Sequence, residues 1–170
     1  MRTLILTVMA LILLGSAAWA DASYYPNGAV LRRGDTIYYP GGQYACRGGT
    51  IYYENGRYLK SGNTYYYADG RYIKQCNVIF YNNGEYLKSG DMYFYENGRY
   101  ASKGGQCYHQ NGSSAGDGSI TLKERLGAGD GYLIVKINSR CVRESIVVCL
   151  GKGIYMKIDM DTGDVELTDF

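Results

Sequence analysis

The sequence predicts an all-β protein: an elongated antiparallel meander of seven 14-residue β-hairpin repeats, followed by a small β-rich C-terminal segment. Three observations lead to this prediction. Most of the recurring glycines follow Asn or Asp, the flanking residues are rich in Tyr, and the glycines keep a fixed period. They stand 14 residues apart, at Gly28, Gly42, Gly56, Gly70, Gly84, Gly98 and Gly112. A short unit reused at one period indicates that each unit buries its apolar surface against the next.

The first 20 residues have the pattern of a secretory signal peptide. Arg2 precedes an apolar run over residues 4–14, and Ala18-Trp19-Ala20 resembles a cleavage site. We therefore expect an exported protein, periplasmic or extracellular or at the cell surface, that begins at Asp21. No Cys follows the expected cleavage site, so we expect no lipid anchor.

Residues 21–112 form the Tyr- and Gly-rich hairpin-repeat sheet of this prediction. Dipeptides such as Asn55-Gly56 tolerate positive φ at both centres of a two-residue turn, and the flanking Tyr residues favour strands. A second series of glycines keeps the same period and reverses the chain again, with Cys76 in place of one member. We expect up to about 14 short strands, because each unit contributes two.

Two-residue turns at Asn55-Gly56 and Gly62-Asn63 predict that Tyr53 lies opposite Tyr58 and that Tyr58 lies opposite Tyr67. Continuing this register gives one cross-strand row of tyrosines: Tyr39, Tyr44, Tyr53, Tyr58, Tyr67, Tyr72, Tyr81, Tyr86, Tyr95 and Tyr100. Lys60, Lys74 and Lys88 share the face of this row, because side chains alternate between faces. We interpret this Tyr/Lys face as wet and as the candidate binding surface, and the opposite, more apolar face as the core.

The phrases "TYYYADGRY", "IYYENGRYLKSG" and "FYNNGEYLKSG" give residues 24–112 a resemblance to MORN-type repeats, especially their bacterial variant form. The 14-residue unit is shorter than the family unit, and it lacks the Trp that the family often carries. The resemblance implies an elongated antiparallel sheet used for protein–protein or membrane-associated scaffolding. It does not imply an enzyme.

Residues 113–119 read as a Gly/Ser-rich linker, after which the Tyr repeat stops. Residues 120–170 predict five strands, at 120–123, 132–137, 145–150, 154–158 and 165–167. Two interpretations remain open for them: an independent β domain, or a cap on the exposed end of the repeat sheet.

Five cysteines in an exported chain indicate disulfides. Cys141 and Cys149 are the candidate pair, on adjacent strands. Cys46, Cys76 and Cys107 are each about four strands apart, roughly 19 Å at ~4.8 Å per strand, which is too far for them to pair in a flat meander. Asp159, Asp161 and Asp164 form a weak calcium candidate, for which an acidic hairpin turn is the alternative.

The remaining residues favour binding over catalysis. The chain has one His, His109, which stands in a repeat slot otherwise held by Tyr. We therefore expect no enzyme, no metal and no cofactor, with a small hydrolase in the C-terminal segment as a remote alternative. Residues 21–112 carry 10 Lys/Arg and 7 Asp/Glu without a basic run, so we expect no nucleic acid partner.

The expected partner is a protein, or a second copy of the chain through self-association. The alternative is an envelope-associated module in which the Tyr/Lys face lies on a glycan or on a lipid surface.

Overall fold

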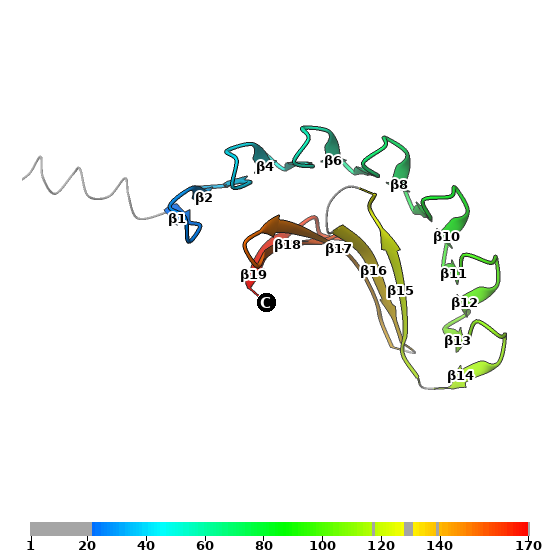
Figure 1. Ribbon diagram of the computed structural model, residues 1–170. Helices are drawn as coiled ribbons and strands as arrows, with labels where there is room; N and C mark the ends of the chain where they lie inside the picture. The colour runs from blue at the N-terminus through cyan, green and yellow to red at the C-terminus, as the bar shows by residue number, and fades with distance from the viewer. Residues whose placement is uncertain (1–21, 117, 128–130, 139, 170) are drawn as a thin grey trace, which may run out of the picture.

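The computed structural model describes residues 22–116, 118–127, 131–138 and 140–169, which form two antiparallel sheets (Figure 1). The first sheet holds 14 strands in chain order. Its strands are β1 (Ala22–Tyr24), β2 (Val30–Arg33), β3 (Thr36–Tyr38), β4 (Tyr44–Arg47), β5 (Thr50–Tyr52), β6 (Tyr58–Ser61), β7 (Thr64–Tyr66), β8 (Tyr72–Gln75), β9 (Val78–Phe80), β10 (Tyr86–Ser89), β11 (Met92–Phe94), β12 (Tyr100–Lys103), β13 (Gln106–Tyr108) and β14 (Ser114–Gly116).

The second sheet holds five strands, also in chain order. They are β15 (Ile120–Arg125), β16 (Gly131–Ile137), β17 (Val142–Gly151), β18 (Ile154–Asp159) and β19 (Val165–Asp169). The prediction of an all-β hairpin meander followed by a small β-rich segment is confirmed. The predicted linker 113–119 needs a correction, because β14 lies inside it and closes the first sheet.

The predicted signal at residues 1–20 lies outside the described residues. Within the described ranges, no helix is long and apolar enough to cross a membrane.

Each repeat turns through a three-residue loop, not through the predicted two-residue turn. In the loop Glu54-Asn55-Gly56, the Tyr53 N–H donates to the Arg57 carbonyl at 2.8 Å and the Gly56 N–H donates to the Tyr53 carbonyl at 2.9 Å. Gly56 has a φ of 81°, a left-handed conformation that a Cβ disfavours. These contacts define a type I turn followed by a glycine bulge, and the same backbone pair of bonds recurs in all seven repeats.

The bulge changes the register that the sequence predicts. Across β5 and β6, Ile51 pairs with Lys60 and Tyr52 pairs with Tyr58, so Tyr53 does not lie opposite Tyr58. The prediction of one continuous tyrosine row is therefore wrong, because a shift of one residue moves side chains to the other face of a sheet. The second turn of each unit does have two residues, since Ser61 pairs with Thr64 around Gly62-Asn63.

The repeat sheet is arched, and the C-terminal sheet lies in its concavity (Figure 1). Buried side chains of both sheets belong to one hydrophobic core. Ile51 and Ile79 of the repeat sheet are fully buried, as are Leu133, Ile146 and Met156 of the C-terminal sheet. The C-terminal sheet thus packs against the concave face of the repeat sheet and covers it.

A buried carboxylate joins the two sheets. Glu144 of β17 is 2% exposed, and its Oε1 accepts hydrogen bonds from Lys88 Nζ at 2.6 Å and from the Tyr93 hydroxyl at 2.8 Å. Its Oε2 accepts from Lys74 Nζ at 3.0 Å. Burial alone would raise the pKa of Glu144, but the bonds from Lys88, Lys74 and Tyr93 outweigh burial and hold this pKa below its usual value.

The assignment of faces made from the sequence is therefore wrong for the lysines. Lys74 and Lys88 lie on the concave face against Glu144, not on a wet surface. The local sequence pattern places these lysines on a solvent-exposed face, because it does not reveal that Glu144 of the distant strand β17 pairs with them.

Candidate functional site: the convex aromatic row

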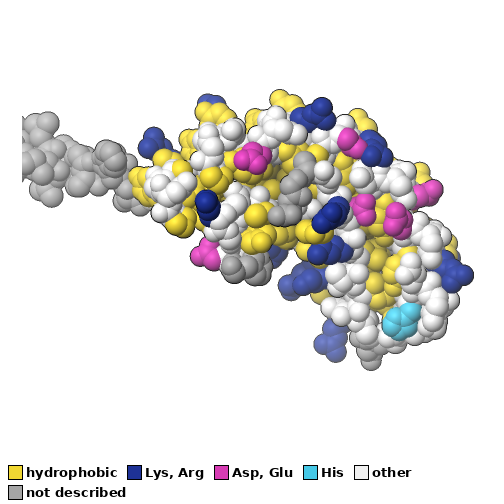
Figure 2. All heavy atoms as spheres, in the orientation of Figure 1, with side chains coloured by type: hydrophobic (Ala, Val, Ile, Leu, Met, Phe, Trp, Pro, Cys, Tyr) yellow, Lys and Arg dark blue, Asp and Glu magenta, His cyan; other side chains and the backbone are white. Residues whose placement is uncertain are grey.

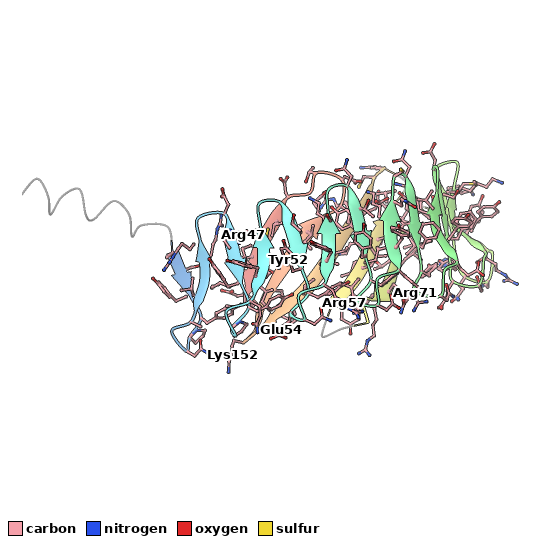
Figure 3. All side chains as sticks on the ribbon, turned by 90° about the horizontal axis from the view of Figure 1, so that it is seen from above. Arg47, Tyr52, Glu54, Arg57, Arg71 and Lys152 are labelled. Carbon is pink, nitrogen blue, oxygen red and sulfur yellow. The ribbon has the colours of Figure 1, made fainter. Side chains whose placement is uncertain are left out.

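The convex face of the repeat sheet carries a row of exposed aromatic side chains. Tyr52 follows Ile51, whose partner Lys60 faces the C-terminal sheet, so Tyr52 and its neighbour Tyr58 point to the convex side. Figure 3 looks onto this side and shows Tyr52 and Arg47 there, with Glu54, Arg57 and Arg71 along one edge.

The row consists of five ring pairs, one for each of five successive repeats. Ring centroids within a pair lie 5.1–5.5 Å apart with tilts of 34–37°. We name the following residues the convex aromatic row: Tyr38 with Tyr44, Tyr52 with Tyr58, Tyr66 with Tyr72, Phe80 with Tyr86, and Phe94 with Tyr100. Tilted aromatic contacts at this distance are favourable, so each pair holds its outer tyrosine in place.

The outer member of each pair is the most exposed. The outer members are 40–54% exposed: Tyr44, Tyr58, Tyr72, Tyr86 and Tyr100. Among the described residues, Tyr24 is the one other large hydrophobic side chain that is exposed to this extent. Cations stand over two of these rings: the Arg47 guanidinium lies 4.8 Å from the Tyr44 centroid, and Lys103 Nζ lies 4.6 Å from that of Tyr100.

Grooves between neighbouring repeats adjoin the row at its loop edge. A groove of about 520 Å³ is lined by Arg57, Tyr58, Tyr66 and Asp69 among others. The equivalent groove three repeats further on has about 600 Å³ and is lined by Arg99, Tyr100, Lys103 and Tyr108 among others. Apolar rings with cationic and amide groups beside them offer both dispersion contacts and hydrogen bonds to a ligand.

Arginines on this edge are held by the next repeat. Arg57 Nη1 donates to the Ala68 carbonyl at 2.8 Å, and Arg71 Nη1 donates to the Asn82 carbonyl. Arg99 donates in the same way to the Gln110 carbonyl, at 3.3 Å. The guanidinium groups are thereby fixed beside the rings, which lowers the entropy that they lose when a ligand binds.

The structure divides the thirteen residues of the predicted binding face into groups with different environments. Tyr39, Tyr53, Tyr67 and Tyr81 are at most 5% exposed, and Tyr95 is half-buried. Their hydroxyls donate to carbonyls of the next repeat, and so does that of Tyr25. Lys74 and Lys88 bind Glu144, and Lys60 lines a separate pocket. The exposed part of the predicted face is Tyr44, Tyr58, Tyr72, Tyr86 and Tyr100.

The predicted Cys141–Cys149 disulfide is wrong. Cys149 lies within β17 and Cys141 directly precedes the same strand, so the two are eight positions apart along an extended chain that rises ~3.3 Å per residue. The resulting distance of roughly 26 Å far exceeds what a disulfide spans. All five cysteines carry free thiols in the structure, with Cys46 and Cys107 buried and Cys76 and Cys141 exposed.

The three aspartates of the calcium candidate make other contacts. Asp159 Oδ1 accepts from the backbone N–H groups of Asp161 and Thr162, both at 2.9 Å, and these bonds lower the pKa of Asp159. Asp161 Oδ1 lies 3.3 Å from Lys74 Nζ. Among the described residues, no three His, Cys, Asp or Glu side chains gather to hold a metal ion. These residues form the hairpin turn between β18 and β19.

Sequence reasoning missed Glu144 and the pairing of Tyr52 with Tyr58. A signal for Glu144 does exist, since Lys74 and Lys88 occupy the same repeat slot and need a partner if that face is covered. The pairing depends on the bulge, which an Asn-Gly dipeptide alone does not distinguish from a two-residue turn.

Comparisons of the chain with protein-family models, with curated proteins and with solved structures find no match. The resemblance to MORN-type repeats stays a prediction.

Proposed function

We propose that this chain is an exported, non-enzymatic binding protein that holds a protein partner on the convex aromatic row. One observation carries the proposal: five exposed tyrosines stand in stacked pairs, one pair per repeat, on the face that the C-terminal sheet leaves uncovered. Extended apolar surface on a protein usually marks an interaction site.

The composition of the row supports a protein partner. Tyr and Arg are enriched at the centres of protein interfaces, because each combines a large apolar area with a hydrogen-bonding tip. Here each exposed Tyr is packed against a second ring, and Arg57, Arg71 and Arg99 are fixed beside the row. Little side-chain freedom remains to be lost on binding.

Site-specific photo-crosslinking tests this proposal. A photoreactive phenylalanine analogue is placed at Tyr58 or at Tyr86 in cells that make the protein, and at the exposed Lys136 of β16 as the control position. We expect a defined protein adduct from positions 58 and 86 and none from position 136. Substituting Tyr72→Ser should weaken the adduct at both positions. Equal adducts at all three positions, or no adduct at 58 and 86, would contradict the proposal.

The protein partner can be a second copy of the chain. The mass of the chain from Asp21 onward, measured by light scattering at several concentrations, shows whether the chain self-associates. A dimer that Tyr58→Ser and Tyr86→Ser convert to a monomer would place self-association on the row. A monomer at every concentration directs the search to a different protein.

The regular spacing of the row favours a glycan as the second candidate partner. Successive ring pairs are two strands apart, about 10 Å at ~4.8 Å per strand, so the rings form a linear array of evenly spaced platforms. A polysaccharide of repeating units offers matching apolar ring faces, and the groove residues Arg57 and Asp69 offer hydrogen bonds to its hydroxyls. Cosedimentation with an insoluble β-linked polysaccharide would support this candidate if Tyr58→Ser abolishes it.

A membrane surface is the third candidate. Binding to anionic lipid vesicles would support it if added salt abolishes that binding.

A further inference from the structure

A polar pocket of about 340 Å³ lies where the repeat sheet meets the turn between β18 and β19, on the concave side and away from the convex aromatic row. Lys60, Tyr65 and Lys74 line it from β6, β7 and β8. Asp161 and Thr162 line it from the opposing turn, and Cys76, just after β8, lines it as well. The pocket is thus bounded by both sheets.

Two hydrogen-bond donors in this pocket have no partner among the residues that the structure describes. Tyr65 is only 2% exposed as a residue, but its hydroxyl is not fully buried: it opens onto the pocket and makes no hydrogen bond with the described residues. Lys60 Nζ forms no ion pair there and lies 5.9 Å from the centroid of the Tyr65 ring. By contrast, Lys74 Nζ donates to Glu144, to the Met160 carbonyl and to Asp161, so its three hydrogens are in use.

The charges around the pocket limit what binds there. Lys60 provides a positive charge that has no ion-pair partner among the described residues. Burial, and to a lesser extent the nearby carboxylates of Asp159 and Asp161, raise the pKa of Tyr65 to about 12. The Tyr65 hydroxyl therefore stays protonated and able to donate. Two carboxylates nearby disfavour a dianion such as phosphate, because like charges repel at short range.

We propose that this pocket binds a monovalent carboxylate group, with the Lys60 ammonium and the Tyr65 hydroxyl as its two donors. A charge-assisted bond from an ammonium and a bond from a phenol satisfy both oxygens of one carboxylate. The carboxylate belongs to a small acid or to the C-terminus of a peptide. This site is separate from the convex aromatic row, so its test does not bear on the proposed function.

Cys76 provides the readout, because it is exposed and lines the pocket. Iodoacetate and iodoacetamide alkylate the same thiolate: the sulfur attacks the methylene carbon, the S–C bond forms and iodide leaves. The thiol proton goes to solvent in both cases. The ratio of the two rates therefore cancels the reactivity of the thiol and reports only whether the carboxylate of iodoacetate is drawn to the site. Peptide mass spectrometry reads Cys76 separately from the other thiols of the reduced, full-length protein.

We expect Lys60→Gln to lower the iodoacetate-to-iodoacetamide ratio at Cys76 on the order of tenfold, the factor that loss of one charge-assisted hydrogen bond brings. Tyr65→Phe should lower the ratio less. The matched control, Lys103→Gln, removes a lysine on the convex face and should leave the ratio unchanged. In the wild-type protein the iodoacetate rate should saturate with concentration.

Competition separates the two sources of the carboxylate. Acetate should protect Cys76 from iodoacetate, and inorganic phosphate should protect it less. Stronger protection by a short peptide with a free C-terminus than by its C-terminal amide or by acetate identifies a peptide terminus; equal protection by acetate and the free peptide identifies a small acid. An unchanged ratio in Lys60→Gln, or protection by phosphate equal to that by acetate, would overturn the proposal.

Discussion

At the scale of single residues, the two recurring Tyr positions of each repeat have different roles. The first Tyr of each unit, Tyr53 for example, is buried and donates its hydroxyl to the carbonyl of a residue 13 positions later, here Tyr66 at 2.8 Å. The second, Tyr58, is 54% exposed and stacks on Tyr52. The first Tyr links neighbouring repeats, whereas the second supplies binding surface.

Tyr53→Phe should destabilise the protein by about 1–2 kcal/mol, because it removes one hydroxyl and leaves the Tyr66 carbonyl without that donor. Ring packing is preserved, so the hydrogen bond is the main change. Urea denaturation followed by circular dichroism measures the loss. Tyr58→Phe is the matched control and should change stability by less than about 0.5 kcal/mol. Equal effects of the two substitutions would refute the division of roles.

Buried tyrosines also make the fold sensitive to alkali. Burial raises the pKa of Tyr25 and Tyr65 from 10.0 to about 12, and it raises the pKa of Tyr39, Tyr53 and Tyr67 further. Since the folded pKa lies above the unfolded one, this stabilisation is complete below pH ~10 and is lost as the pH rises toward 12 and beyond.

We therefore expect the buried tyrosines to ionise together with alkaline unfolding, in a late step of tyrosinate absorbance. Absorbance and circular dichroism, recorded on the same alkaline titration, check this coincidence. A single tyrosinate step in a protein that remains folded would contradict it.

At the scale of elements, the period-14 glycines and Asn-Gly dipeptides predict the hairpins and the number of strands, because turn chemistry is local. The five C-terminal strands are likewise predicted, since runs such as "YLIVKI" are apolar and bounded by turns. Register is not predicted, because it depends on one bulged residue per repeat. The disulfide prediction fails for a related reason: β17 begins at Val142, before its apolar run, so Cys141 and Cys149 follow one strand and do not lie on adjacent strands.

Glu144 provides the charged contact between the two sheets, beside their shared hydrophobic core. Glu144→Gln should destabilise the protein by about 3 kcal/mol, because the buried Lys74 and the half-buried Lys88 lose their charge partner. Glu166→Gln is the control: it breaks an exposed pair with Lys157 at 3.9 Å and should cost less than about 0.5 kcal/mol. Urea denaturation at neutral pH compares the two variants.

Acid should act through the same group. The folded pKa of Glu144 lies below its ordinary value of 4.5, so its contribution to stability is present above that value and is lost as the pH falls through the folded pKa. The wild-type protein should therefore lose more stability between pH 5 and 3 than Glu144→Gln does. Parallel losses in the two proteins would show that Glu144 does not carry this pH dependence.

At the scale of the whole molecule, the C-terminal sheet fills the concave side of the arch and leaves the convex side to solvent (Figure 1). Figure 2 shows how the hydrophobic side chains on the visible face lie among scattered charges of both signs. The sequence predicts a tyrosine-lined binding face in general terms, and half of its tyrosines are indeed exposed. It does not predict which face is covered, because Lys74 and Glu144 are 70 residues apart.

The two roles of the tyrosines are tested most directly by tyrosine nitration of the folded protein, with each site read by peptide mass spectrometry. We expect fast nitration of the exposed Tyr44, Tyr58, Tyr72, Tyr86 and Tyr100. We expect slow nitration of the buried Tyr39, Tyr53, Tyr67 and Tyr81 until denaturant is added. Similar rates at both groups in the folded state would contradict the division of the tyrosines between a buried ladder and an exposed binding row.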